Sequence, residues 1–149
     1  MIFVTVYENC GQLSNTGAPV NVTQTQYFSI PVVLNFTLID TTTNLAIPAC
    51  DPIKPGTSIS LATLPHTTLS VRANVNPDPV GSVLFSSDLL SATHTENTAP
   101  YSLCGDNAGI YNNCLINLGK HTVTATPYPS AALGGIPGAS NTITFTIIN

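Results

Sequence analysis

The sequence predicts an all-β protein, an antiparallel β-sandwich with Greek-key connections, and three observations lead to this prediction. Apolar and polar residues alternate along most of the chain with the two-residue period of a strand, and helical periodicity is nearly absent. Turn-forming residues recur roughly every 8–12 residues, which is typical of a sandwich. Charged residues make up only 7% of the chain, and the threonines that replace many of them suit a pleated strand.

The pattern divides most of the chain into strands and turns. We expect strands at residues 2–7, 32–40, 45–48, 57–64, 68–75, 81–88, 121–128 and 141–148. Residues 91–103 form a polar strand or two short ones, and residues 11–24 form a loop. Alternation predicts these inward-facing residues: Leu69, Val71, Ala73, Val75, Val83, Phe85, Val123, Ala125, Ile143, Phe145 and Ile147. Tryptophan is absent, so an immunoglobulin-like domain would belong to the broad fibronectin-like class, without the antibody-type Cys…Trp…Cys core.

The charge excludes two classes of partner. Three basic residues, Lys54, Arg72 and Lys120, stand against seven acidic ones. A nucleic-acid-binding protein needs many phosphate contacts, and docking on an anionic membrane needs a basic patch. No segment approaches the ~18–20 consecutive apolar residues of a membrane-spanning helix, so we expect neither nucleic-acid binding nor membrane insertion.

Four cysteines, Cys10, Cys50, Cys104 and Cys114, allow three pairings. Cys104 and Cys114 bracket one Gly/Asn-rich loop, which favours a local disulfide between them, and Cys10 with Cys50 then follows by elimination. Such bridges predict an extracellular or cell-surface protein. Four free thiols in a cytosolic protein are the alternative; a zinc site is disfavoured because no CxxC pair or histidine has ligand spacing.

Two N-glycosylation sequons also predict a secreted glycoprotein, Asn21-Val-Thr and Asn35-Phe-Thr. Asn35 lies in a predicted strand in which Leu34, Phe36 and Leu38 share one face. Asn35 therefore projects from the opposite face, where a glycan could reach solvent. In a bacterium without the glycosylation pathway, both sequons would mean nothing.

The C-terminal four fifths of the chain resembles a known module. Its motifs are GSVLF (81–85), TENTAPY (95–101), GDNAGIYN (105–112), GKHTVTATPY (119–128), GGIPG (134–138), NTITFT (141–146), FTLID (36–40), LATLP (61–65) and LSVRAN (69–74). These motifs resemble immunoglobulin-like β-sandwich repeats of large secreted and surface proteins, mainly bacterial and algal. The resemblance covers residues 32–148 and implies a sandwich domain over 32–149, with residues 1–31 as a separate N-terminal arm. It also implies a spacer or adhesive role.

The chain departs from the repeat pattern at the loop between Cys104 and Cys114. Ile110 stands where the repeats usually have aspartate, and the two flanking cysteines are not part of the pattern. The loop still offers candidate ligand residues: Asp106, Asn107, Asn112, Tyr101 and Tyr111. Exposed tyrosines stack on sugars, and Asp106 is a weak Ca²⁺ candidate because Ca²⁺ usually takes several carboxylates. The alternatives are an Asx-type turn and tyrosines packed at the sandwich edge with hydroxyls bonded to backbone.

No residue set predicts catalysis, cofactor binding or a metal centre. His94 and Glu96 share a strand face, but nothing nearby in the sequence supplies a nucleophile, and a solvent-facing pair is the simpler interpretation. Ser86, Ser87 and Asp88 lack the strained elbow of a serine hydrolase. Arg72 is expected to pair with an acid such as Asp88 or Glu96.

These expectations combine into a non-catalytic structural or adhesive subunit of an extracellular surface assembly or filament. The N-terminal strand is apolar on both faces and is followed by a long loop. It either adds an edge strand to its own domain or pairs with copies of the chain, or neighbouring modules, by β-strand addition. The alternative function is a carbohydrate-binding module, Ca²⁺-assisted or not, that uses the Cys104–Cys114 loop to bind glycans.

Overall fold

The computed structural model describes residues 2–6 and 24–149, and the chain divides into two compact units, Met1–Ile30 and Pro31–Asn149. This division lies one residue from the predicted boundary of the N-terminal arm. In the first unit, β1 (Ile2–Val6) pairs antiparallel with β2 (Gln24–Phe28), which forms a two-stranded sheet of its own. The sequence did not predict β2, because its polar residues give no clear alternation.

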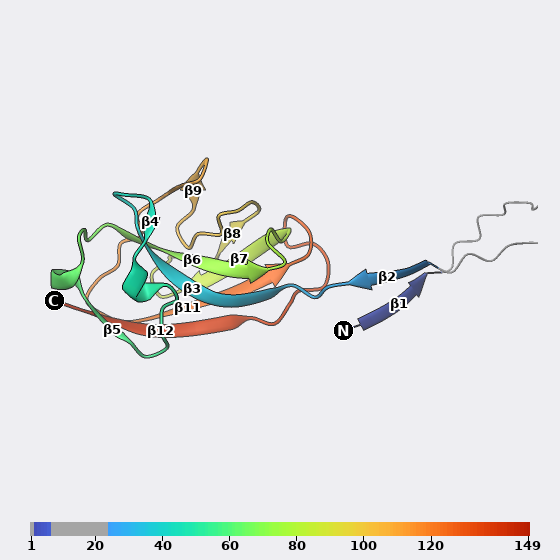
Figure 1. Ribbon diagram of the computed structural model, residues 1–149, viewed down its shortest axis with the longest axis horizontal. Coiled ribbons are helices and arrows are strands. Elements are labelled where there is room, and N and C mark those ends of the chain that lie inside the picture. The colour runs from blue at the N-terminus through green and yellow to red at the C-terminus, as the bar shows by residue number, and fades with distance from the viewer. Residues whose placement is uncertain (1, 7–23) are drawn as a thin grey trace, which may run out of the picture. The chain divides into compact units, whose positions relative to one another are not determined.

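The second unit is built from two main sheets (Figure 1). The larger sheet has the strand order β5-β12-β11-β7-β8, and the smaller one has the order β4-β3-β6. Their elements are β3 (Val32–Asp40), β4 (Leu45–Ala46), β5 (Ser58–Ser60), β6 (Leu69–Asn76), β7 (Ser82–Ser87), β8 (His94–Glu96), β11 (Gly119–Tyr128) and β12 (Asn141–Ile148). The pairs are antiparallel except β5 with β12. The all-β prediction is confirmed; the Greek-key and immunoglobulin-like assignments stay predictions.

Short elements complete this unit. Two 3-10 turns, η1 (Pro48–Cys50) and η2 (Leu61–Thr63), lie in the connections between β4 and β6. The short strands β9 (Asp106–Asn107) and β10 (Ile110–Tyr111) pair as a hairpin where the sequence predicted only a loop.

The core is made by the inward faces of the strands, as the alternation predicts. Leu69, Val71, Val83, Phe85 and Val123 are completely inaccessible to solvent. The remaining predicted inward residues are buried as well, namely Ala73, Val75, Ala125, Ile143, Phe145 and Ile147. Apolar side chains from both sheets thus form one cluster, and burial of this apolar area is the main source of the unit's stability.

One predicted face in β3 is wrong. Leu34 is 56% exposed, whereas Val33, Phe36 and Leu38 are buried. The register against β6 shifts between Val33 and Asn35, which is the signature of a β-bulge. The extra residue breaks the two-residue period, so Leu34 points away from the core that Phe36 and Leu38 enter.

A segment outside the named strands extends the smaller sheet along the edge of β6. The Ala73 N–H donates to the Tyr101 carbonyl at 2.9 Å, and the Leu103 N–H donates to the Val71 carbonyl at 2.8 Å. The Tyr101 ring is buried, and its hydroxyl donates to the Val80 carbonyl. Burial raises the pKa of Tyr101. The structure therefore shows the second alternative for Tyr101: the ring packs at the edge of the sandwich, and its hydroxyl is hydrogen-bonded to the backbone.

Candidate functional site

The predicted local disulfide is present between Cys104 and Cys114, with the Cα atoms 5.6 Å apart. It closes the loop that carries the β9–β10 hairpin. The turn of the hairpin contains Ala108 and Gly109, both at positive φ. The Asp106 carboxylate accepts the Gly109 N–H at 2.5 Å, so it caps the turn of its own loop as the Asx-turn alternative predicts.

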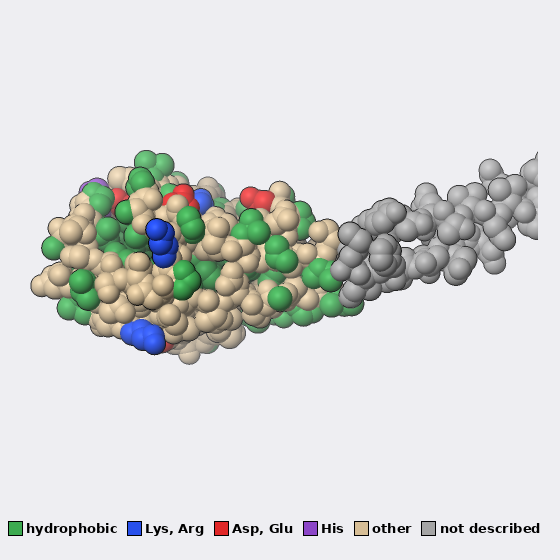
Figure 2. All heavy atoms as spheres, turned by 60° about the horizontal axis from the view of Figure 1, so that its bottom comes forward, with side chains coloured by type: hydrophobic (Ala, Val, Ile, Leu, Met, Phe, Trp, Pro, Cys, Tyr) green, Lys and Arg blue, Asp and Glu red, His purple; other side chains and the backbone are tan. Residues whose placement is uncertain are grey.

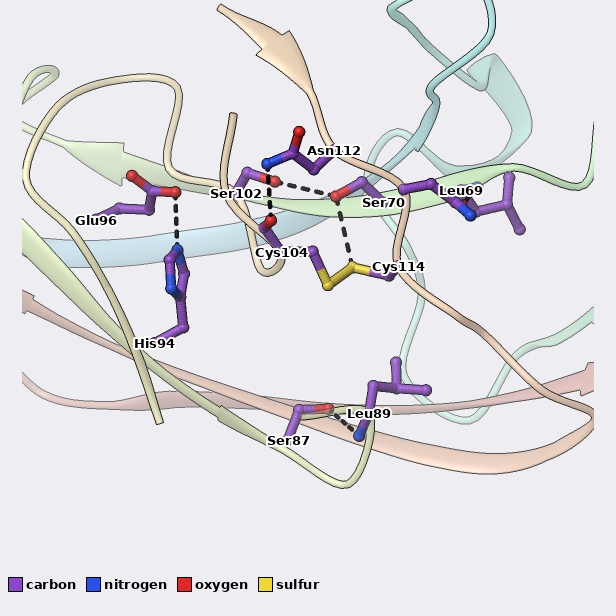
Figure 3. Close-up of a disulfide and its surroundings, with 11 residues drawn as sticks. Leu69, Ser70, Ser87, Leu89, His94, Glu96, Ser102, Cys104, Asn112 and Cys114 are labelled. Carbon is purple, nitrogen blue, oxygen red and sulfur yellow. Dashed lines mark hydrogen bonds and ion pairs between the residues drawn. A yellow bond between two sulfur atoms is a disulfide. The ribbon is translucent and has the colours of Figure 1, made fainter. Parts of the chain in front are cut away.

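The loop is fixed to the smaller sheet on both sides of the disulfide. Ser70 of β6 lies with its hydroxyl 3.0 Å from that of Ser102 and 3.7 Å from the Cys114 sulfur (Figure 3). Asn44, in the turn after β3, donates to the Gly109 carbonyl at 3.0 Å and accepts the Tyr111 N–H at 2.9 Å. Contacts from β6 and from the turn after β3 therefore hold the loop in one position.

The predicted ligand residues of this loop do not converge on a common point. Tyr101 and Tyr111 are only 2% and 8% exposed, so neither ring is free to stack on a sugar. Asn107 and Asn112 are exposed, and the Asn112 amide donates to the Cys104 carbonyl at 3.2 Å. Across residues 2–6 and 24–149, no group of three or more His, Cys, Asp or Glu side chains is placed to hold a metal ion.

His94 and Glu96 form an ion pair beside this loop, with Nε2 2.9 Å from Oε1 (Figure 3). The pair is less solvent-facing than the sequence suggested, because the Glu96 side chain is only 12% exposed. Gly105 covers it so closely that a Cβ atom there would lie 3.4 Å from Glu96 Oε1 and 3.5 Å from His94 Nε2. Burial raises the pKa of Glu96, and the charge of Asp106 adds to this effect while His94 opposes it.

The other two histidines of the chain are also paired with carboxylates. His66 Nδ1 lies 2.7 Å from Asp40 Oδ2, and His121 Nδ1 lies 2.7 Å from Asp88 Oδ2. The second ring nitrogen of His121 lies 2.7 Å from the Asn117 carbonyl oxygen. Both nitrogens are thus occupied, and neither is available to activate Ser86 or Ser87 as a nucleophile.

These pairs correct the expectation for Arg72. The sequence predicted an ion pair with Asp88 or Glu96, but His121 and His94 occupy those two carboxylates. In the part of the chain that the structure describes, every ion pair joins a histidine to an acid. The Arg72 Nε–H instead donates to Asn74 Oδ1 at 2.9 Å. The alternation places Arg72 and Asn74 as outward neighbours on one strand, but it did not predict this hydrogen bond.

The pKa shifts of Asp40 and Glu96 have opposite signs, so the stability of variants at these two residues should respond to pH in opposite directions. The His66 side chain and the Thr42 and Thr43 N–H groups lower the pKa of Asp40 despite its burial. Asp40 therefore stabilises the fold above its unfolded-state pKa, and this contribution is lost as the pH falls through the lowered value. Glu96 has a raised pKa, so its contribution declines as the pH rises through the window between its unfolded and folded values.

The Asp40→Asn variant should therefore lose more stability relative to wild type at about pH 7 than at about pH 3. The Glu96→Gln variant should behave in the opposite way: its stability relative to wild type should increase between about pH 3 and about pH 7. Urea unfolding of the three proteins at both pH values measures these differences. Identical pH dependence of all three proteins would contradict the assigned shifts.

Several predicted residues remain outside this description or untested by it. Cys10 and Asn21 lie outside the described residues, so the Cys10–Cys50 bridge and the Asn21 sequon stay predictions. Cys50 itself is buried in the core, and burial raises the pKa of its thiol. Asn35 is half-buried with its Oδ1 accepting from Asn74 Nδ2 at 2.6 Å, and its glycosylation also stays a prediction.

The chain matches no protein-family model, no curated protein and no solved structure. Among the described residues, none of the helices is long and apolar enough to cross a membrane.

Proposed function

We propose that the chain is a structural or adhesive subunit of an extracellular surface assembly, joined to copies of itself or to neighbouring modules by β-strand addition through β1. The observation that carries this proposal is the separate β1–β2 sheet of the N-terminal unit. A two-stranded ribbon is marginally stable alone in water. Within the described residues each of its strands pairs on one edge only, and an unpaired edge is a template for another strand.

The surface of the second unit also supports this proposal. On the face that Figure 2 shows, a few charged side chains lie among mostly uncharged polar and apolar groups. The exposed large apolar residues of this unit are Leu34, Leu45, Ile110, Leu115, Leu118, Ile136 and Ile148. Few charges give weak repulsion between copies. The local disulfide fits an oxidising extracellular environment, and the three histidines serve as ion-pair partners.

Proline substitutions in β1 test the strand addition. Successive residues of a strand direct their N–H groups to opposite edges. One of the two substitutions Val4→Pro and Thr5→Pro therefore removes an N–H donor that faces β2, and the other removes a donor on the opposite edge of β1. We expect both variants, and a chain lacking residues 1–9, to abolish the large species formed by wild type. Size-exclusion chromatography with light scattering and negative-stain electron microscopy measure this loss.

Thr5→Val is the matched control because it keeps the N–H and the preference for strand conformation. It should assemble like wild type. A wild-type protein that stays monomeric at all concentrations, with no change on deletion of residues 1–9, would contradict the proposal.

A further inference from the structure

A groove of about 450 Å³ lies where β6 meets the segment that pairs with its edge, between residues 72–75 and residues 99–101. Its walls are formed by Arg72, Ala73, Asn74, Val75, Asp78, Ala99, Pro100 and Tyr101. The volume falls within the ~300–1,000 Å³ range of small-molecule sites, and the lining combines the polar side chains of Arg72, Asn74 and Asp78 with the apolar ones of Ala99 and Pro100.

Arg72 is the only arginine in the chain, and its side chain is half-buried at this groove. It takes part in none of the ion pairs of the described residues. Of its five N–H donors, the one on Nε is used by Asn74. The terminal nitrogens are the part of a guanidinium that binds a carboxylate with two parallel hydrogen bonds. A partly desolvated cation that makes no direct ion pair is costly, and a bound anion would lower that cost.

A chain of hydrogen bonds fixes the position of the guanidinium. Asn74 accepts from Arg72 through Oδ1, and its Nδ2 donates to Thr37 Oγ1 at 2.8 Å and to Asn35 Oδ1 at 2.6 Å. The buried Thr37 hydroxyl in turn donates to Asp51 Oδ1 at 2.6 Å. All donors point the same way along this chain, so each bond polarises the next. Arg72 is therefore held in place before any ligand arrives, which lowers the entropy cost of binding.

The other polar group of the groove narrows the chemistry of the ligand. Asp78 is exposed and contributes the one carboxylate of the lining, which would repel a simple anion and accept hydrogen bonds from hydroxyl groups. Ala99 and Pro100 offer small apolar surfaces to C–H groups. A ligand that fits this groove needs a carboxylate to pair with Arg72, hydroxyl groups to donate to Asp78 and an apolar face to pack on Pro100. A sugar acid carries all three groups.

We propose that this groove binds a sugar that carries a carboxylate, with Arg72 holding the carboxylate and Asp78 accepting from ring hydroxyls. This site is independent of the strand addition proposed above, and its lining includes no residue from Cys104 to Cys114. Asn74 acts as a positioning residue for Arg72.

Titration of the full chain with glucuronate, followed by amide chemical shifts, tests the site. We expect saturable shifts at Ala73, Val75 and Tyr101 in the millimolar range, about the affinity of a weak single-sugar contact. The methyl ester of glucuronate keeps the ring and loses the charge, so it should bind about tenfold or more weakly. Arg72→Gln should weaken glucuronate by a similar factor, whereas Lys54→Gln, which removes an exposed cation outside the groove, should leave it unchanged.

Equal binding of glucuronate and its methyl ester, or an absence of shifts at the groove, would overturn the proposal. Acetate that binds as tightly as glucuronate would overturn the assignment of a sugar. The comparison of acid and ester uses the wild-type chain, so it decides the question even where Arg72→Gln fails to fold.

Discussion

Replacing Phe85 by alanine is expected to lower the free energy of unfolding by about 3–5 kcal/mol. The Phe85 side chain is completely buried, and its strand β7 lies between β11 and β8, with Phe85 opposite Ala125 and His94. Truncation removes the transfer free energy of the ring and leaves a cavity that paired strands on both sides cannot easily close. A domain of this size is stable by only ~5–15 kcal/mol, so the loss is a large share of the total.

Ser86→Ala, at the next residue of the same strand, is the control. Ser86 is exposed, and surface substitutions usually change stability by less than about 0.5 kcal/mol. Chemical denaturation followed by circular dichroism measures both variants. A Phe85→Ala protein as stable as Ser86→Ala would contradict the burial of Phe85 in the core, between β11 and β8.

Removing the disulfide by the double substitution Cys104→Ala/Cys114→Ala is the second large effect that we expect. The bridge closes a loop over a sequence separation of 10, for which the chain-entropy model gives about 2–3 kcal/mol. The hydrogen bonds from Asn44 and Asp106 remain in the variant, so the loop should loosen while the sandwich stays folded. Thermal unfolding measures the stability, and hydrogen exchange at residues 105–113 measures the loosening.

Wild-type protein treated with reductant provides the matching comparison. It should unfold at the same temperature as the double variant if Cys104–Cys114 is the sole bridge. A further drop under reductant would reveal the Cys10–Cys50 bridge that the sequence predicts. A double variant as stable as oxidised wild type would contradict the stabilising role of the bridge.

The sequence predicts most of the fold of the second unit because strand alternation is a local signal. Leu69, Val71, Ala73 and Val75 are buried as their spacing indicates. Leu34 is not, because the bulge depends on how β3 is aligned with β6, and that alignment has no counterpart in the sequence around residue 34. β2 was missed for a related reason, since it is recognised only through its pairing with β1.

The candidate sites were less predictable because their contacts join residues far apart in the chain. The Cys104–Cys114 bridge is local and was predicted, but the His121–Asp88 pair spans 33 residues and the His66–Asp40 pair spans 26. The alternation patterns of β3 and β6, considered together, contained a signal for the hydrogen bonds around Arg72. Arg72 and Asn74 occupy the outward positions of one strand, and Asn35 and Thr37 occupy those of its neighbour. Only the pairing of β3 with β6 brings these four residues together.

The starts of β3 and β12 lie at the same end of the sandwich, where the Asn141 amide donates to the Val33 carbonyl at 3.0 Å. β12 ends at the opposite end of the unit (Figure 1). Tension applied between Pro31 and Asn149 therefore pulls β3 by its beginning and β12 by its end, along the strand axes. The hydrogen bonds between β12 and β11, from Asn141 opposite Ala125 to Ile147 opposite Gly119, are then sheared together instead of opening one after another. We therefore expect the unit to resist stretching along its length.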